Sequence, residues 1–285
     1  MKNKKIRKEY ECVLLQIHHT KNMAEISIKI INGIGEIVAQ NTDFEEVNLV
    51  YQKEYQAGDK IIITTSEINK HYFIQVDDAL GGALVYIKKN ELSYAIPFAE
   101  KRLSYSPKIF TGNIHLLSVR LATKEEIQTY RNLAVNVMDA HGDTGCYPHA
   151  SANVETRGES VFAARNAIDG VTENHSHGIW PYESWGINMQ DDAEFRLDFG
   201  RKVVVDKIKL YTRSDFPHDN WWREVTFTFS DGTTLVCELE KSDKAHIIEF
   251  EKKEIEWLLF HKLIKADDPS PFPALSQIQV YGVEA

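Results

Sequence analysis

Cysteine is scarce in this chain of 285 residues, and long apolar runs are absent. The three cysteines, Cys12, Cys146 and Cys237, lie far apart and are odd in number, so no disulfide framework is expected. The basic start of the chain is followed only by the short apolar run 13–15, and no stretch approaches the ~20 apolar residues of a membrane span. These absences predict a cytoplasmic protein with reduced thiols and no membrane partner.

Positive charge is also in short supply. The formal net charge is −9, and a chain of this sign is repelled by phosphate backbones, so nucleic acid is not an expected partner. The pair Gly33 and Gly35 lacks the third glycine and the helix of a dinucleotide-binding motif, and no phosphate-binding loop or G-x-S-x-G elbow occurs. The sequence contains no assembled catalytic set, which makes an enzyme the less favoured interpretation.

The first half of the chain has the pattern of a β-sandwich. Short β-type runs recur with turn signals such as Gly81-Gly82 between them and without intervening helical patterns, which is typical of antiparallel sandwiches. The runs cover residues 26–31, 60–65, 72–76, 83–87 and 115–121.

A helix is expected after the last of these runs. Thr123 and Glu126 form a capping-box signature, and helical spacing continues through Ile127, Tyr130, Arg131 and Ala134. Residues 139–148 then combine Gly, Asp and Pro without periodicity, as a connection does. The length suits two domains, and we place them at residues 1–138 and 139–285.

The second half also has strand patterns. Residues 225–229 alternate strictly and are followed by Asp231-Gly232 and a second β-type run, 234–237. Asp-Gly between two such runs is a strong hairpin signal, because the primed turns need positive φ. The fold class expected for the whole chain is therefore all-β, with two β-sandwich domains and a short connecting helix.

One succession in the second half resembles a known family. The short apolar turn 163–170 ends in Asp169-Gly170, an aromatic polar loop follows, and strand patterns occupy 194–199, 203–211 and 275–282. Over residues 147–285 this order resembles the discoidin, or coagulation factor V/VIII C-type, domain and is similar to family 32 carbohydrate-binding modules. The resemblance implies a galactose-binding-like jelly roll with a sugar site on loops at one end.

Two loops, 175–188 and 213–223, hold four of the five tryptophans. Sugars present apolar C–H faces rimmed by hydroxyl groups, so a sugar site needs an aromatic plate beside hydrogen-bonding side chains. We therefore expect a non-catalytic, lectin-like carbohydrate-binding protein. The candidate ligand contacts are Arg213, Asp215, His218, Asp219, Trp221, Trp222, His177, Trp180, Tyr182 and Trp185.

Three alternatives stay open for these loops. The tryptophans could fill the ends of the core, with the charged residues forming a surface ion-pair cluster. The chain could instead be an intracellular carbohydrate-active enzyme, with Asp215, His218, Asp219 and Glu183 in a cleft between the domains. It could also be a protein-interaction module with a large flat apolar patch.

The turn at Asp169 resembles the structural calcium loop of these modules. The resemblance implies Asp169, Asn174 and Gln277 as oxygen ligands, with Gln277 where the family carries a glutamate. Calcium favours roughly six to eight hard oxygen ligands, so a lost carboxylate weakens the site. The competing interpretation is that Asp169 caps its own turn through backbone hydrogen bonds.

Overall fold

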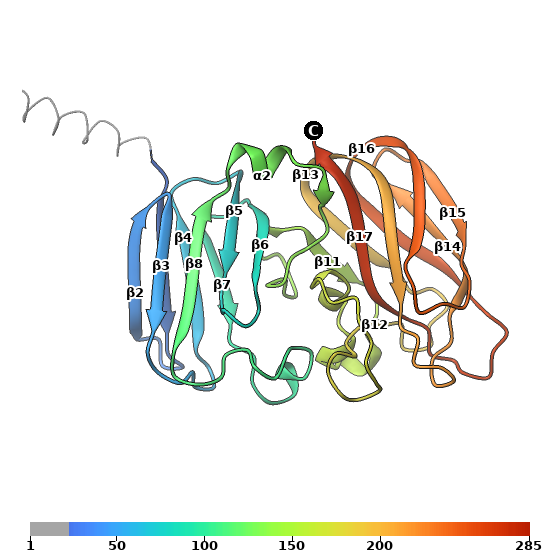
Figure 1. The fold of residues 1–285 in the computed structure, drawn as a ribbon, viewed down its shortest axis with the longest axis horizontal. Coiled ribbons are helices and arrows are strands. Elements are labelled where there is room, and N and C mark those ends of the chain that lie inside the picture. The colour runs from blue at the N-terminus through green and yellow to red at the C-terminus, as the bar shows by residue number, and fades with distance from the viewer. Residues whose placement is uncertain (1–22) are drawn as a thin grey trace, which may run out of the picture.

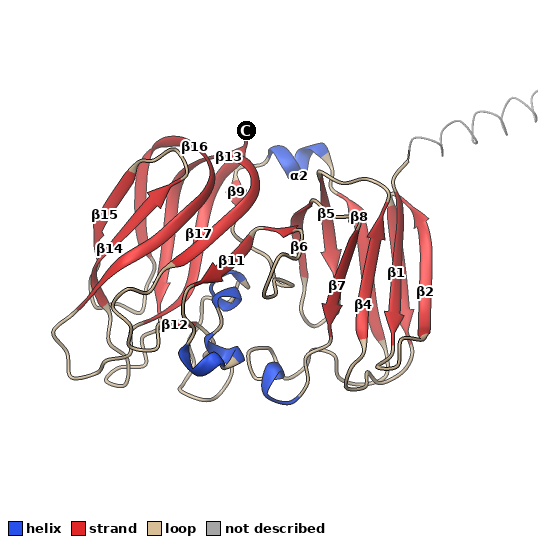
Figure 2. Ribbon diagram, turned by 180° about the vertical axis from the view of Figure 1, so that it is seen from behind, coloured by secondary structure: helices blue, strands red, loops and turns tan. Residues whose placement is uncertain are grey.

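The computed structural model describes residues 23–285, and it consists of two β-sandwiches lying side by side (Figures 1 and 2). The expected all-β class is confirmed. The predictions for the first 22 residues, Cys12 among them, lie outside the described part. In the described part no helix is long and apolar enough to cross a bilayer.

The first sandwich packs a four-stranded sheet on a five-stranded sheet, both antiparallel. Side chains such as Ile26, Ile61 and Val85 alternate inward and fill a common core. The first sheet has the order β2 (Ile37–Phe44), β1 (Glu25–Ile31), β4 (Lys60–Thr65) and β7 (Glu91–Ala95). The second has the order β10 (Cys146–Tyr147), β6 (Gly82–Ile87), β5 (Lys70–Gln75), β8 (His115–Leu121) and β3 (Glu46–Tyr51).

Each of the five β-type runs of the first half forms a strand, namely β1, β4, β5, β6 and β8. The strands β2, β3 and β7 were not expected from the sequence, although β3 and β7 alternate between buried and exposed residues. β2 lies at the edge of its sheet and exposes most of its residues, so it has no apolar alternation to reveal it.

The predicted helix is present but short. α2 (Lys124–Gln128) begins with the capping box, in which Thr123 accepts from the Glu126 N–H and Glu126 accepts from the Thr123 N–H. The prediction of a helix through Ala134 was wrong, because the strand β9 (Arg131–Asn132) pairs with the last strand of the chain. Pairing with a distant strand overrides the local helical spacing here.

The second sandwich is built from one hydrogen-bonded path of long strands. Its core is aromatic, with Trp185, Phe195, Trp222 and Phe260 fully buried. The path has the order β12 (Trp185–Gly186), β17 (Ala274–Glu284), β13 (Phe195–Thr212), β16 (His246–Lys265), β14 (Trp222–Phe229) and β15 (Thr234–Glu238), and β11 (His149–Ala152) pairs with β13.

The runs 194–199 and 203–211 are parts of one strand, β13, and not two separate strands. Its pairing with β16 shifts register after Asp198 and again after Val205, as at β-bulges. The predicted hairpin is confirmed as β14 and β15, with Gly232 at φ 84° in the turn. The apolar turn before Asp169 forms the 3₁₀ helix η4 (Ala164–Ile168), which follows η2 (Thr156–Gly158) and η3 (Ser160–Phe162).

The connection between the sandwiches packs into both cores. Leu133 and Ala134 belong to the second core, whereas Met138 and Cys146 belong to the first. The boundary expected after residue 138 stays a prediction, because residues on each side of it contribute to the opposite sandwich.

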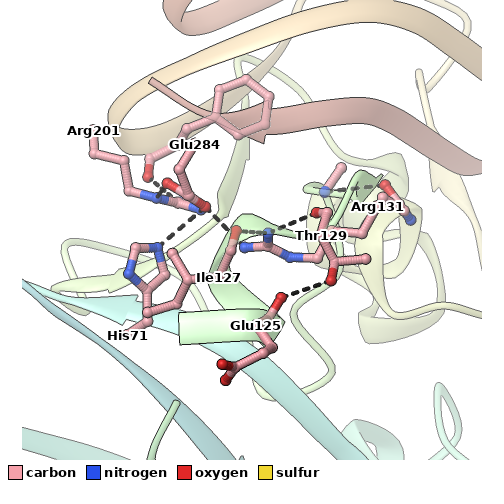
Figure 3. Close-up of polar contacts among 10 residues, drawn as sticks. His71, Glu125, Ile127, Thr129, Arg131, Arg201 and Glu284 are labelled. Carbon is pink, nitrogen blue, oxygen red and sulfur yellow. Dashed lines mark hydrogen bonds and ion pairs between the residues drawn. The ribbon is translucent and has the colours of Figure 1, made fainter. Parts of the chain in front are cut away.

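A half-buried ion cluster also joins the two sandwiches (Figure 3). Glu284 of β17 accepts two hydrogen bonds from Arg201, at 2.7 and 2.8 Å, and one from Arg131 at 2.8 Å. The His71 ring of β5 lies 3.2 Å from the same carboxylate. One side chain of the last strand is thus held by groups from both sandwiches and from their connection.

Candidate functional site

A groove lies among loops at one end of the second sandwich, and we call it the loop-end groove. Its cavity volume is about 110 Å³. The loops around η2 and β12, the β13–β14 loop and the β16–β17 loop contribute its walls. The polar and aromatic side chains that line it include Arg157, His177, Asn188, Arg213, His218 and Phe272.

Arg213 lies at the base of the groove and is held by a buried ion pair. Its Nε lies 2.9 Å from both carboxylate oxygens of Asp219, and its Nη2 also donates to that carboxylate. The Asp215 N–H donates to the same group at 2.8 Å, which fixes the loop around the pair. The remaining nitrogen, Nη1, is buried and has no partner among the described residues. A guanidinium positioned in this way offers an unused donor to a ligand.

Two histidines and a phenylalanine form the wall beside Arg213. The His177 and His218 rings meet edge to face, with centroids 4.1 Å apart, and Phe272 lies 5.6 Å from His218. Burial lowers the pKa of His177, and Arg213 and His218 lower it further. His177 is therefore neutral at pH 7 and can both donate and accept a hydrogen bond. Phe272 is 40% exposed and offers an apolar face.

The opposite wall depends on tight backbone geometry. Asn188 and Met189 both have positive φ, and the Asn188 N–H donates to the Thr156 hydroxyl at 2.9 Å. A Cβ at Gly186 would lie 2.6 Å from that hydroxyl, so only glycine fits there without movement. These contacts hold η2 against β12 and fix this side of the groove.

The structure brings together three of the predicted contacts, Arg213, His177 and His218, in this groove. Asp219 is fully buried behind them and orients Arg213. Asp215 takes part through its backbone N–H.

The expectation for Trp185 and Trp222 needs correction. Both side chains are fully buried. Trp185 packs on Phe195 with tilted rings, and Trp222 packs edge to face on Phe260. Their apolar area stabilises the core, so they cannot contact a ligand without disrupting it.

The other three aromatic candidates lie outside the groove lining. Trp221 is half-buried, faces Phe216 and has the Lys241 ammonium 4.9 Å from its ring centre. Tyr182 is buried in a small cluster with Val161 and Phe162, and its ring lies 6.3 Å from that of His177. Trp180 is half-buried in the loop before it.

The carboxylates proposed for an enzyme do not converge on His218. Asp219 is committed to Arg213, and Glu183 accepts from the Tyr182 N–H at 2.9 Å, away from the groove lining. Burial raises the pKa of Glu183. Asp219 and Glu183 are therefore not arranged as a general acid and a general base on opposite sides of a substrate.

The calcium candidates form a turn that is closed by its own hydrogen bonds. An Asp169 oxygen accepts from the Val171 N–H at 2.9 Å, and the Gln277 amide oxygen accepts from the Gly170 N–H at 3.1 Å. Burial raises the pKa of Asp169 well above its usual range. The amide nitrogen of Asn174, the third candidate, is buried and has no partner among the described residues, and no contact joins Asn174 to Asp169 or Gln277 there. This set fits a capped turn better than an ion cage, and calcium binding stays a prediction.

Several groove residues were not foreseen, including Arg157, Asn188, Met189 and Phe272. Phe272 had a visible signal, since Pro269, Pro271 and Pro273 surround it between two strand patterns. Prolines fix φ and leave an isolated aromatic side chain on a stiff loop.

Comparison with known proteins gives a family for part of the chain. Residues 146–281 match the family described as a domain of unknown function, DUF7402. No curated protein matches the sequence.

Several of the solved structures similar to this chain are sugar-binding modules. Chitosan-binding module 1 of a chitosanase/glucanase from Paenibacillus sp. IK-5 is 19% identical, with a TM-score of 0.37 over 53% of this chain and 98% of the module. A family 32 module from C. perfringens in complex with galactose is 17% identical, with a TM-score of 0.36 over 46% and 91%. A fucose-binding module from Streptococcus pneumoniae is 14% identical, with a TM-score of 0.38 over 54% and 98%. Superpositions this loose do not carry a ligand over to this chain.

Proposed function

We propose that this protein is a non-catalytic carbohydrate-binding protein and that the sugar sits in the loop-end groove. The observation that carries the proposal is the buried Nη1 of Arg213. Asp219 holds the rest of the guanidinium, and the unpaired nitrogen belongs to a side chain that lines the groove. A sugar hydroxyl can accept a hydrogen bond from it.

The other groups of the groove suit the same ligand. Neutral His177 offers both a donor and an acceptor to hydroxyl groups, and Phe272 offers a face for the C–H side of a ring. The cavity of about 110 Å³ is well below the ~300 Å³ at which sites for drug-sized ligands begin. We therefore expect one terminal sugar unit to be bound and not the middle of a long glycan.

A glycan array with the purified chain identifies the sugar, and calorimetry with the best glycan tests the site. We expect His218→Ala and Phe272→Ala each to weaken binding by about tenfold or more, which is about 1.4 kcal/mol. His175→Ala is the matched control, because His175 is exposed in the same loop region but does not line the groove.

Two results would contradict the proposal. One is an array without any bound glycan. The other is a bound glycan whose affinity is the same in the His218→Ala, Phe272→Ala and His175→Ala variants.

A further inference from the structure

A second, larger cavity lies between the two sandwiches, and we call it the inter-sandwich cavity. Its volume is about 540 Å³. The first sandwich contributes the segment 94–105, which includes the 3₁₀ helix η1 (Ala99–Arg102). The connection contributes 139–141, and the second sandwich contributes residues near η3 and η4. The turns of the two halves face each other in Figure 2. A volume of this size is in the range of small-molecule sites, ~300–1,000 Å³.

Hydrogen bonds between the two sandwiches fix one side of the cavity. The Ser160 N–H and hydroxyl of η3 donate to the side chain and backbone carbonyl of Glu100 in η1, at 2.6 and 2.9 Å. These bonds join the two sandwiches beside the cavity, so its shape does not depend on a free loop.

Arg165 is the chemical centre of the cavity. Its side chain is only 7% exposed, and it donates to the Asp139 and Val137 carbonyls at 3.0 and 3.3 Å and to the Asn166 side chain at 2.9 Å. Its guanidinium also lies 4.3 Å from the centre of the Tyr105 ring. These contacts use three of the ~5 N–H groups of an arginine. No carboxylate of the described residues forms an ion pair with it, so its charge is balanced only at longer range.

The formal charges of the lining balance, with Lys60, Lys101 and Arg165 against Asp59, Glu100 and Asp139. Lys60 and Lys101 are exposed at its edge and have no ion-pair partner in the described part of the chain. The Asp139 carboxylate is engaged by His149, at 2.8 Å, and by the Ala150 N–H, at 2.9 Å. Glu100 is engaged by Ser160, and one Asp59 oxygen accepts from the Gln56 N–H at 2.8 Å, while its other oxygen has no partner among the described residues. The two lysines and the unused N–H groups of Arg165 are thus available to a ligand, while each anionic group already has at least one protein donor.

Apolar and aromatic groups line the same cavity. Phe98 and Tyr105 are half-buried there, next to buried Ile96 and Pro97. An aromatic wall beside a guanidinium with unused N–H groups suits a molecule that has an anionic group on a ring.

We propose that the inter-sandwich cavity binds a small anionic ring compound, with its carboxylate or phosphate at Arg165 and its ring against Phe98 and Tyr105. This site is separate from the loop-end groove, because the residues that line the two do not overlap. A ligand there contacts both sandwiches and stabilises their arrangement.

Calorimetry on the full chain with four probes tests the proposal. Glucuronate and glucose 6-phosphate combine a ring with a carboxylate or a phosphate, glucose has the ring alone, and inorganic phosphate has the charge alone. We expect at least one acidic sugar to bind about tenfold or more tightly than both glucose and inorganic phosphate. The affinities of glucuronate and glucose 6-phosphate, compared with each other, show whether the site prefers a carboxylate or a phosphate. Binding of all four probes at similar strength, or of none, overturns the proposal.

Variants locate the binding. Lys101→Gln and Phe98→Ala change exposed or half-buried side chains, so both should fold, and each should weaken the acidic sugar severalfold. Lys252→Gln removes the same charge from an exposed position elsewhere and should leave affinity unchanged. Arg165→Lys should abolish binding if it folds, but the test does not depend on it.

The two proposals fail in different ways. If the acidic sugar binds and His218→Ala removes that binding while Lys101→Gln and Phe98→Ala do not, the ligand sits in the loop-end groove. That result overturns the second site and leaves the first intact. Loss of binding in the Lys101 and Phe98 variants alone supports the second site even if no array glycan reaches the groove.

Discussion

Phe227 and Phe272 illustrate how the same residue type has different roles in one sandwich. Phe227 points inward from β14, is fully buried and packs on Phe260 with ring centroids 5.2 Å apart. Phe272 stands on the loop before β17, is 40% exposed and faces His218. The exposed fraction of the side chain thus distinguishes the core residue from the candidate site residue.

We expect Phe227→Ala to lower the free energy of unfolding by about 3–5 kcal/mol, because it removes buried apolar area and leaves a cavity. Phe272→Ala should cost less than about 1 kcal/mol, since its side chain is partly in solvent. Urea unfolding of both variants measures the difference. Equal losses would mean that Phe272 is part of the core and would remove it from the proposed site.

The predicted calcium site at the Asp169 turn can be tested with a chelator. Its carboxylate accepts the Val171 N–H, so we expect a chelator to leave the melting temperature unchanged. A calcium ion at about a hundredfold its Kd would contribute about 2.7 kcal/mol, a shift of several degrees. The melting temperature could instead fall in chelator and be restored by calcium but not by magnesium. That result would show that the turn holds an ion.

At the scale of elements, the groove depends on how closely η2 packs on β12. Gly186 is the contact point, because a Cβ there would lie 2.6 Å from the Thr156 hydroxyl and 3.3 Å from the Phe162 Cβ. Thr156 in turn holds the Asn188 backbone. A change in this spacing displaces this side of the groove.

Gly186→Ala should therefore weaken sugar binding severalfold and cost about 1–3 kcal/mol through overpacking. Gly232→Ala is the control: it strains the hairpin turn at φ 84° but has open space and lies far from the groove residues. It should lower stability without changing affinity. Calorimetry and thermal unfolding separate the two effects, and wild-type affinity in Gly186→Ala would contradict the role of this contact.

At the scale of the molecule, the two sandwiches are held together by polar groups as well as by a shared connection. Burial raises the pKa of Glu284, but the hydrogen bonds from His71 and Arg201 outweigh it and hold the pKa far below its usual value. A carboxyl whose pKa is lower in the folded state stabilises the fold above its unfolded pKa of about 4.3 and loses this contribution as the pH falls.

Glu284→Gln should lower the free energy of unfolding by about 1–3 kcal/mol at pH 7, because it leaves two half-buried arginines without their carboxylate. The difference from the wild type should shrink as the pH falls below about 4, because the carboxyl of the unfolded chain then binds a proton while the folded one stays charged. Denaturant unfolding at pH 7 and at low pH measures it. A difference that is constant with pH would show that the Glu284 charge does not hold the sandwiches together.

Local patterns in the sequence determined the all-β class, the strands with strict alternation, the Asp231-Gly232 hairpin and the start of α2 at its capping box. Turn chemistry and side-chain alternation act over a few residues, so the sequence displays them directly. The sequence also pointed to Arg213, His177 and His218, because polar and aromatic residues gather in two loops.

Only the tertiary structure decided which side chains of those loops face a ligand. Trp222 is buried by Phe260 of a strand 38 positions later, and Phe272 reaches His218 from another loop. The inter-sandwich cavity likewise needs both sandwiches, because its lining combines Tyr105 of one with Arg165 of the other. Burial and site geometry come from contacts between segments distant in sequence, and no local pattern encodes them.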